Sequence, residues 1–210
     1  MAGALPGTAN HEPTSAQVRA AIPRGLLQTV EHPMQAERVR RRLTGASRAQ
    51  LEGAGRSDWL SAEVLLDVYE SIADISGELG LQSCVRKFAC DAIGLAIFGG
   101  IVSSALRILG PSPGTLFRLI PLGLAASLRH AGEVQVQEAR FGSEIVVHWT
   151  GLEPRLRVPA WVSASLGAYR GLLDLSGVTG EVCFGAGDCS QGELRFEVRW
   201  DVKSAAVGGG

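Results

Sequence analysis

The clearest pattern along the chain is a strict alternation close to its C-terminal end. In the segment ELRFEVRW, Leu194, Phe196, Val198 and Trp200 fall on one side and charged residues fall on the other. A period of two predicts a strand with one buried and one solvated face. The preceding segment VTGEVCF, joined to it by the loop GAGDCSQG, is expected to pair with it as a hairpin.

A second hairpin is predicted upstream of the first. Residues 133–138 (EVQVQE) alternate apolar and polar positions, residues 141–143 (FGS) form a turn, and residues 144–149 return as the partner strand. Between the two hairpins, a helix is expected over residues 159–175, because a proline opens it and Gly177 follows its end.

Helical spacing dominates the first half of the chain. Apolar positions from Val64 to Ile75 recur at intervals of three and four behind a Ser61 cap, which predicts an amphipathic helix ending near residues 77–80. Before it, residues 18–58 show a broken pattern, in which VRAAI suggests a short strand and GLLQTVEH and AERVRRRL suggest short helices.

Two further helices are predicted after this one. The first covers residues 81–109, with a bend at residues 99–100, where two glycines are adjacent. The second covers residues 112–130, and Pro121 inside it removes a backbone donor, which predicts a kink or a split.

The order helices, hairpin, helix, hairpin implies an α+β fold, with helices packed on an antiparallel sheet built from two hairpins separated by a helix. We expect a single domain over residues 17–202. Residues 1–16 and 203–210 lack an apolar period and are rich in small residues and prolines or glycines, which is typical of a disordered leader and a flexible tail.

Charge and composition narrow the range of partners. Lys and Arg number 20 against 21 Asp and Glu, so the chain lacks the basic surplus with which proteins neutralise phosphates, and no nucleic acid is expected as a partner. The first residues show neither a basic region nor an apolar stretch, which favours a cytoplasmic location and reduced cysteines.

Residues 92–109 are the most apolar stretch of the chain. A membrane-spanning helix needs about 20 predominantly apolar residues, whereas Lys87 and Asp91 precede this stretch and Arg107 interrupts it. We therefore predict a buried helix and no membrane span.

The order of elements resembles a superfamily that includes the 4-vinyl-reductase-type ligand-binding domain, the haem NO-binding domain and the TRAPP-like trafficking domain. The chain is most similar to a paralogous group of uncharacterised myxobacterial proteins of about this length. The resemblance covers residues 59–202 and is carried by Trp59 before the helix VLLDVYESIADISGELG, and by SPGTLFRLIP, GAYRGLLDLSGVTGEV and ELRFEVRW. It implies a helix-covered antiparallel sheet, dimerisation and an apolar cavity between helices and sheet.

Two departures from the superfamily concern its functional residues. The haem-binding branch holds the haem propionates with a Tyr-x-Ser-x-Arg motif, whereas this chain has Tyr69, Ser71 and then Ala73. The vinyl-reductase branch tends to end with paired cysteines around a Gly-Asp turn. Here Cys183 and Cys189 flank such a turn, but the second cysteine comes early relative to the final strand.

Cysteine and histidine spacing predicts no metal site. Cys84 and Cys90 are six residues apart on a predicted helix, which rotates one about 240° from the other around the helix axis, so they cannot bind one ion together. Cys183 and Cys189 are weak candidates for a metal or redox site, because zinc sites favour closer pairs and four ligands. The four histidines form no metal-binding motif, and no nucleophile elbow or phosphate loop is present. We expect no catalytic residues and no cofactor.

What remains is an apolar pocket. The predicted architecture brings several large side chains together, and glycines leave room beside them. The candidate pocket residues are Phe88, Ile97, Phe98, Phe117, Trp149, Trp161 and Tyr169.

Three hypotheses follow. The first is a non-enzymatic sensory module that binds an apolar small molecule and forms a homodimer. The second is a scaffold protein whose fold serves dimerisation alone, and the third is a metal or redox protein centred on Cys183 and Cys189. An open apolar cavity between helices and sheet would favour the first, and a filled interface would favour the second.

Overall fold

The computed structural model describes most of the chain. It covers residues 15–30, 32–92, 104, 108, 110–138, 142–185 and 187–201. The predicted leader and tail lie outside these residues, except for Ser15 and Ala16. Ala16 is buried, and its carbonyl accepts a hydrogen bond from the Ala62 N–H at 2.9 Å, so this residue is part of the packed structure.

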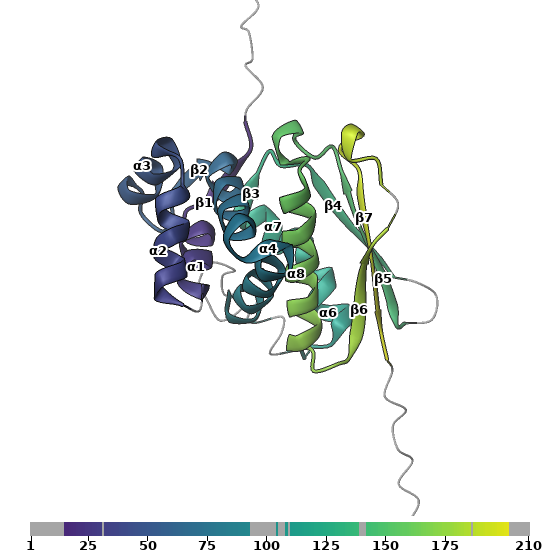
Figure 1. The fold of residues 1–210 in the computed structure, drawn as a ribbon. Helices are drawn as coiled ribbons and strands as arrows, with labels where there is room; N and C mark the ends of the chain where they lie inside the picture. The colour runs from purple at the N-terminus through teal and green to yellow at the C-terminus, as the bar shows by residue number, and fades with distance from the viewer. Residues whose placement is uncertain are drawn as a thin grey trace, which may run out of the picture.

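A four-stranded antiparallel sheet forms one side of the molecule (Figure 1). Its strands, in spatial order, are β4 (Glu133–Glu138), β5 (Glu144–Thr150), β7 (Leu194–Trp200) and β6 (Gly180–Phe184). Both predicted hairpins are present, and they join because β5 pairs with β7, with Val147 opposite Phe196. The predicted α+β fold is confirmed.

One face of this sheet is buried and the other is solvated. Ile145, Val147 and Trp149 of β5 alternate with less buried residues, and Leu194, Phe196 and Val198 of β7 are fully buried. Trp200 is only partly buried at the end of its strand. On the outer face, Arg199 pairs with the carboxylates of Glu144 and Glu197. The alternation therefore predicted the two faces of β7 correctly.

Two long helices are stacked on the buried face, one next to the sheet and one behind it (Figure 1). Helix α8 (Pro159–Leu175) lies against the sheet, and α4 (Ala62–Ala92) packs along α8 (Figure 1). The break predicted near residues 77–80 occurs at Gly77, whose φ of 74° and ψ of 172° are not helical. The two segments that we predicted as separate helices thus meet at this glycine, which adopts a left-handed φ without a Cβ clash.

The N-terminal region packs on the far side of α4 (Figure 1). Its helices are α1 (Ala21–Thr29), α2 (Pro33–Arg42) and α3 (Gly45–Gly53). A small sheet in the order β2-β1-β3 accompanies them, formed by β1 (Gln17–Arg19), β2 (Trp59–Ser61) and β3 (Leu128–Arg129).

This region differs from the prediction in two places. The segment VRAAI is a strand only as far as Arg19, and α1 takes over at Ala21, because Pro23 in the first helical turn costs no hydrogen bond. Helix α3 was not predicted. It begins at a Thr44 cap, whose hydroxyl accepts a hydrogen bond from the Ser47 N–H.

The helix predicted over residues 112–130 is split, as expected from Pro121. Helix α6 (Pro113–Arg118) and helix α7 (Ile120–Ser127) meet at Leu119, so that the proline lies in the first turn of α7. Two short 3₁₀ turns, η2 (Pro154–Leu156) and η3 (Cys189–Gln191), complete the elements.

The apolar stretch of residues 92–109 lies outside the described residues, apart from Ala92, Ser104 and Ile108. Ser104 and Ile108 are both exposed, so they do not support the predicted burial of this segment. Among the helices that the structure describes, none is long and apolar enough to span a bilayer.

Candidate functional site

An apolar cavity of about 200 Å³ lies between the helices and the sheet. Helices α4, α7 and α8 supply most of its walls, and strands β3 and β5 and helices α1 and α6 also contribute. Its aromatic lining residues are Tyr69, Phe88, Trp149, Trp161 and Tyr169. No charged side chain is found among the described residues that line it.

The sequence of α8 explains why this helix can contact α4 and line the cavity at once. Ser163, Gly167 and Gly171 recur every four residues and share one helix face. This face is pressed against α4: a Cβ at Gly167 would lie 2.9 Å from the Gln82 Cα, and one at Gly171 would lie 2.6 Å from the Arg86 carbonyl oxygen. Small residues therefore permit the close contact between the two helices.

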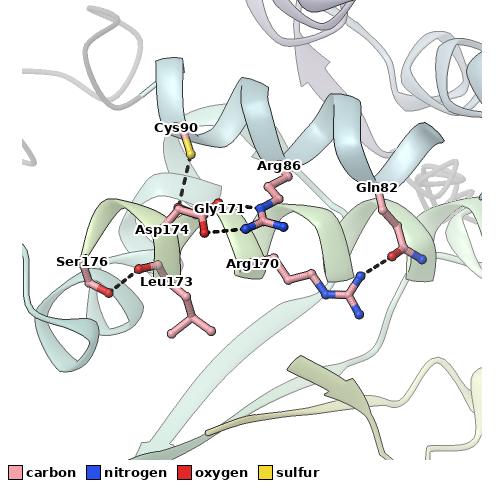
Figure 2. Close-up of polar contacts among 8 residues, drawn as sticks. All are labelled: Gln82, Arg86, Cys90, Arg170, Gly171, Leu173, Asp174 and Ser176. Carbon is pink, nitrogen blue, oxygen red and sulfur yellow. Dashed lines mark hydrogen bonds and ion pairs between the residues drawn. The ribbon is translucent and has the colours of Figure 1, made fainter. Parts of the chain in front are cut away.

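Polar contacts extend along this helix pair (Figure 2). The Arg86 guanidinium donates to both oxygens of Asp174, with Nη2 2.6 Å from Oδ1, and Arg170 donates to the Gln82 side chain. The Cys90 thiol donates to the Gly171 carbonyl at 3.4 Å. These contacts hold α8 in register with α4, and so they fix one wall of the cavity.

An aromatic cluster forms the wall between α8 and the sheet. The Trp149 indole N–H donates to the Tyr169 hydroxyl at 3.0 Å, and the Trp149 and Trp161 rings meet edge to face with centroids 5.7 Å apart. The Tyr69 ring, from α4, lies 6.2 Å from that of Trp161. Edge-to-face pairs at these distances are favourable and rigid.

The two serine hydroxyls around the cavity donate hydrogen bonds to backbone carbonyls. The Ser165 hydroxyl donates to the Trp161 carbonyl oxygen at 2.9 Å, and the Ser127 hydroxyl donates to the Gly123 carbonyl oxygen at 2.5 Å. Burial raises the pKa of Tyr69 and of Tyr169 well above the ordinary range, so both phenols stay protonated and neutral.

One buried donor is different. Within the described part of the chain, the Trp161 indole nitrogen is buried and has no hydrogen-bond partner, while its side chain lines the cavity. Trp161 is only 4% exposed.

The structure brings four of the seven predicted pocket residues around this cavity, namely Phe88, Trp149, Trp161 and Tyr169. Phe117 is fully buried with its ring 5.9 Å from that of Tyr169, but it does not line the cavity. Ile97 and Phe98 lie outside the described residues.

Sequence reasoning missed the aliphatic part of the lining. Leu116, Ile120 and Leu124 of α6 and α7 face the cavity at intervals of four, as Leu65 and Tyr69 of α4 do. That interval was visible in the sequence, but it marked a buried face without showing what the face packs against.

The cysteines and the described histidines do not line the cavity. None of Cys84, Cys90, Cys183 and Cys189 is joined in a disulfide. Cys183 is exposed on β6, and Cys189 begins η3. No group of three or more His, Cys, Asp or Glu side chains suited to a metal occurs in the described ranges.

The fold is that of H-NOX domains. The chain superposes on an unliganded Fe(II) H-NOX protein from K. algicida with a TM-score of 0.58 and 9% identity, covering 89% of this chain and 98% of that one. An oxygen-binding H-NOX domain related to soluble guanylate cyclases, solved as its oxygen complex, matches with a TM-score of 0.55 and 10% identity, over 88% and 95% of the two chains. No family model and no curated protein matches the sequence.

Haem, the group implied by this fold, does not fit the residues present. Proteins hold haem iron through His, Cys, Met or Tyr. Among the described lining residues only Tyr69 and Tyr169 are of these types, and burial keeps both protonated. Residues 93–109, which follow α4, contain no His, Cys, Met or Tyr. The described lining also offers no Arg or Lys for the propionates.

Proposed function

We propose that this chain is a non-enzymatic, dimeric module that senses an uncharged, largely apolar small molecule bound in the cavity between α4, α7, α8 and β5. The observation that carries this proposal is the cavity itself. A cavity of about 200 Å³ between helices and sheet is the feature that distinguishes a binding module from a scaffold with a filled interface.

The surrounding packing supports the same proposal. Gly167 and Gly171 of α8 hold it tightly against α4, and yet the adjoining face of α8 leaves space next to Ala164 and Ala168. A well-packed interior has few voids larger than a water molecule, so an open apolar volume beside such close contacts favours a ligand site.

Within the superfamily, we place the chain nearer to the 4-vinyl-reductase-type and myxobacterial branches than to the haem-binding branch. Ala73 stands where the haem-binding motif has an arginine. The lining lacks a group suited to the haem iron, which supports this placement.

The proposal is tested with α-methylstyrene as an apolar probe, its binding followed by calorimetry and by the fluorescence of the cavity tryptophans. We expect saturable binding to the wild type. Ala168→Leu fills the cavity and should abolish binding, whereas Ala125→Leu makes the same change at an exposed site on α7 and should leave it unchanged. Absence of binding to the wild type, both for this probe and for its carbonyl analogue acetophenone, would overturn the proposal.

The dimer is tested separately by sedimentation velocity over a range of protein concentrations. We expect a species of twice the chain mass that dissociates on dilution. A monomer at every concentration would contradict the dimeric part of the proposal and leave the ligand site standing.

A further inference from the structure

Trp161 lines the cavity and carries a buried hydrogen-bond donor that no described residue uses. Its indole nitrogen is a donor only, and it is buried without a partner among the described residues. Burying a donor in this way costs free energy, and native structures rarely leave such groups unpaired. The protein therefore carries a cost here that a bound molecule could remove.

The neighbouring tryptophan shows that the unpaired donor is not a general property of this wall. Trp149 lines the same cavity, and its indole N–H is satisfied by the Tyr169 hydroxyl at 3.0 Å. The two rings meet edge to face, so they share an environment but differ in their hydrogen bonding.

Water is a poor partner for this donor. A buried water is held by about two to four polar groups. The Ser127 and Ser165 hydroxyls donate to backbone carbonyls, and the Tyr169 hydroxyl accepts from Trp149. In an otherwise apolar lining, the phenol O–H groups of Tyr69 and Tyr169 are the polar groups that remain beside Trp161. A bound water would thus find few groups to hold it besides Trp161.

The volume and the charge of the site restrict the ligand further. An apolar cavity of ~150 Å³ in another protein holds benzene, so about 200 Å³ suits a single ring with a short substituent. Because the described lining holds no charged side chain, an ionised ligand would lose its hydration without compensation.

From these observations we propose that the ligand is a neutral, single-ring molecule with one carbonyl-type acceptor, which accepts a hydrogen bond from the Trp161 indole N–H. The inference rests on the proposed function and specifies its ligand class. Trp161 is then the residue that selects an acceptor-bearing ligand from apolar molecules of the same shape.

Acetophenone and α-methylstyrene test this, because they differ only by a carbonyl oxygen in place of a methylene group. Their dissociation constants are measured for the wild type, Trp161→Phe and Trp200→Phe. The preference for acetophenone should fall by about threefold to tenfold in Trp161→Phe, the value of one neutral hydrogen bond. It should be unchanged in Trp200→Phe, which makes the same change at a partly buried tryptophan outside the cavity.

A second measurement needs no variant. In the ¹⁵N–¹H spectrum of the wild type, acetophenone should move the Trp161 indole N–H resonance downfield, and α-methylstyrene should not. Benzoate, the charged relative, should not bind.

The outcomes separate the two proposals. Binding of α-methylstyrene with no added preference for acetophenone, and no downfield shift at Trp161, overturns the acceptor inference and leaves the cavity function intact. Failure of both neutral probes to bind overturns both. Binding of benzoate as tightly as acetophenone overturns the assignment of a neutral ligand.

Discussion

The Trp149 indole N–H donates a hydrogen bond to the Tyr169 hydroxyl, with 3.0 Å between Nε1 and Oη, and this bond joins strand β5 to helix α8 beside the cavity. Both residues are almost fully buried. The bond satisfies the indole N–H and uses the phenol oxygen as acceptor, and it leaves the wall with an uncharged surface toward the cavity.

Loss of this bond should destabilise the protein. Tyr169→Phe leaves the Trp149 N–H buried and unpaired, and we expect the free energy of unfolding to fall by ~1–3 kcal/mol in urea melts. In a double-mutant cycle with Trp149→Phe, the two losses should be less than additive, because the second change removes a group that has already lost its partner. Fully additive losses would show that the bond contributes nothing.

The two faces of β7 should respond differently to substitution. Phe196 is fully buried and its ring lies 5.1 Å from that of Tyr169, so Phe196→Ala should cost ~3–5 kcal/mol. Arg195 lies on the exposed face, so Arg195→Ala should lower the free energy of unfolding by no more than ~0.5 kcal/mol. Denaturant melts compare the two, and equal losses would mean that both faces are buried in solution.

The glycines between α8 and α4 should not tolerate a methyl group. Gly171→Ala places a Cβ 2.6 Å from the Arg86 carbonyl oxygen, and we expect a loss of ~1–3 kcal/mol from overpacking. The control is Gly45→Ala in α3, where a Cβ meets nothing within 4 Å. This control should be neutral or stabilising by up to ~1 kcal/mol in thermal or chemical melts. A similar effect of both changes would contradict the close helix contact.

Cys90 should react slowly with thiol reagents at neutral pH. Burial, and then the carboxylates of Asp174 and Asp91, raise the pKa of its thiol, and only the thiolate reacts. The rate of alkylation by iodoacetamide, followed by peptide mass spectrometry, should therefore rise as the pH increases beyond 8. Alkylation of the exposed Cys183 is measured in the same samples and serves as the internal reference.

Changing the charge beside Cys90 should move this profile in a known direction. Asp174→Asn removes a carboxylate that disfavours the thiolate and leaves Arg86, which favours it, so the pKa of Cys90 should fall and alkylation at pH 8 should be faster. A pH profile identical to that of the wild type would contradict this electrostatic assignment.

Short sequence patterns were sufficient to predict the elements that carry their own signals, such as an alternation, a proline or a terminal glycine. The alternation in β7 reflects one continuous buried face, and Pro159 and Gly177 mark the two ends of α8, so the strand, the helix and their bounds could be predicted. Pro121 was likewise a local signal, because a proline without its N–H splits a helix wherever the chain folds.

The sequence by itself determined the two hairpins, the helix between them and the presence of large aromatic residues on elements that meet. Only the tertiary structure decided that Phe117 packs behind Tyr169 while Phe88 lines the cavity, because burial alone does not distinguish a filled site from an open one. It alone decided that Trp149 has a partner and Trp161 has none, since these two donors differ only in which residue, distant in sequence, lies beside each of them.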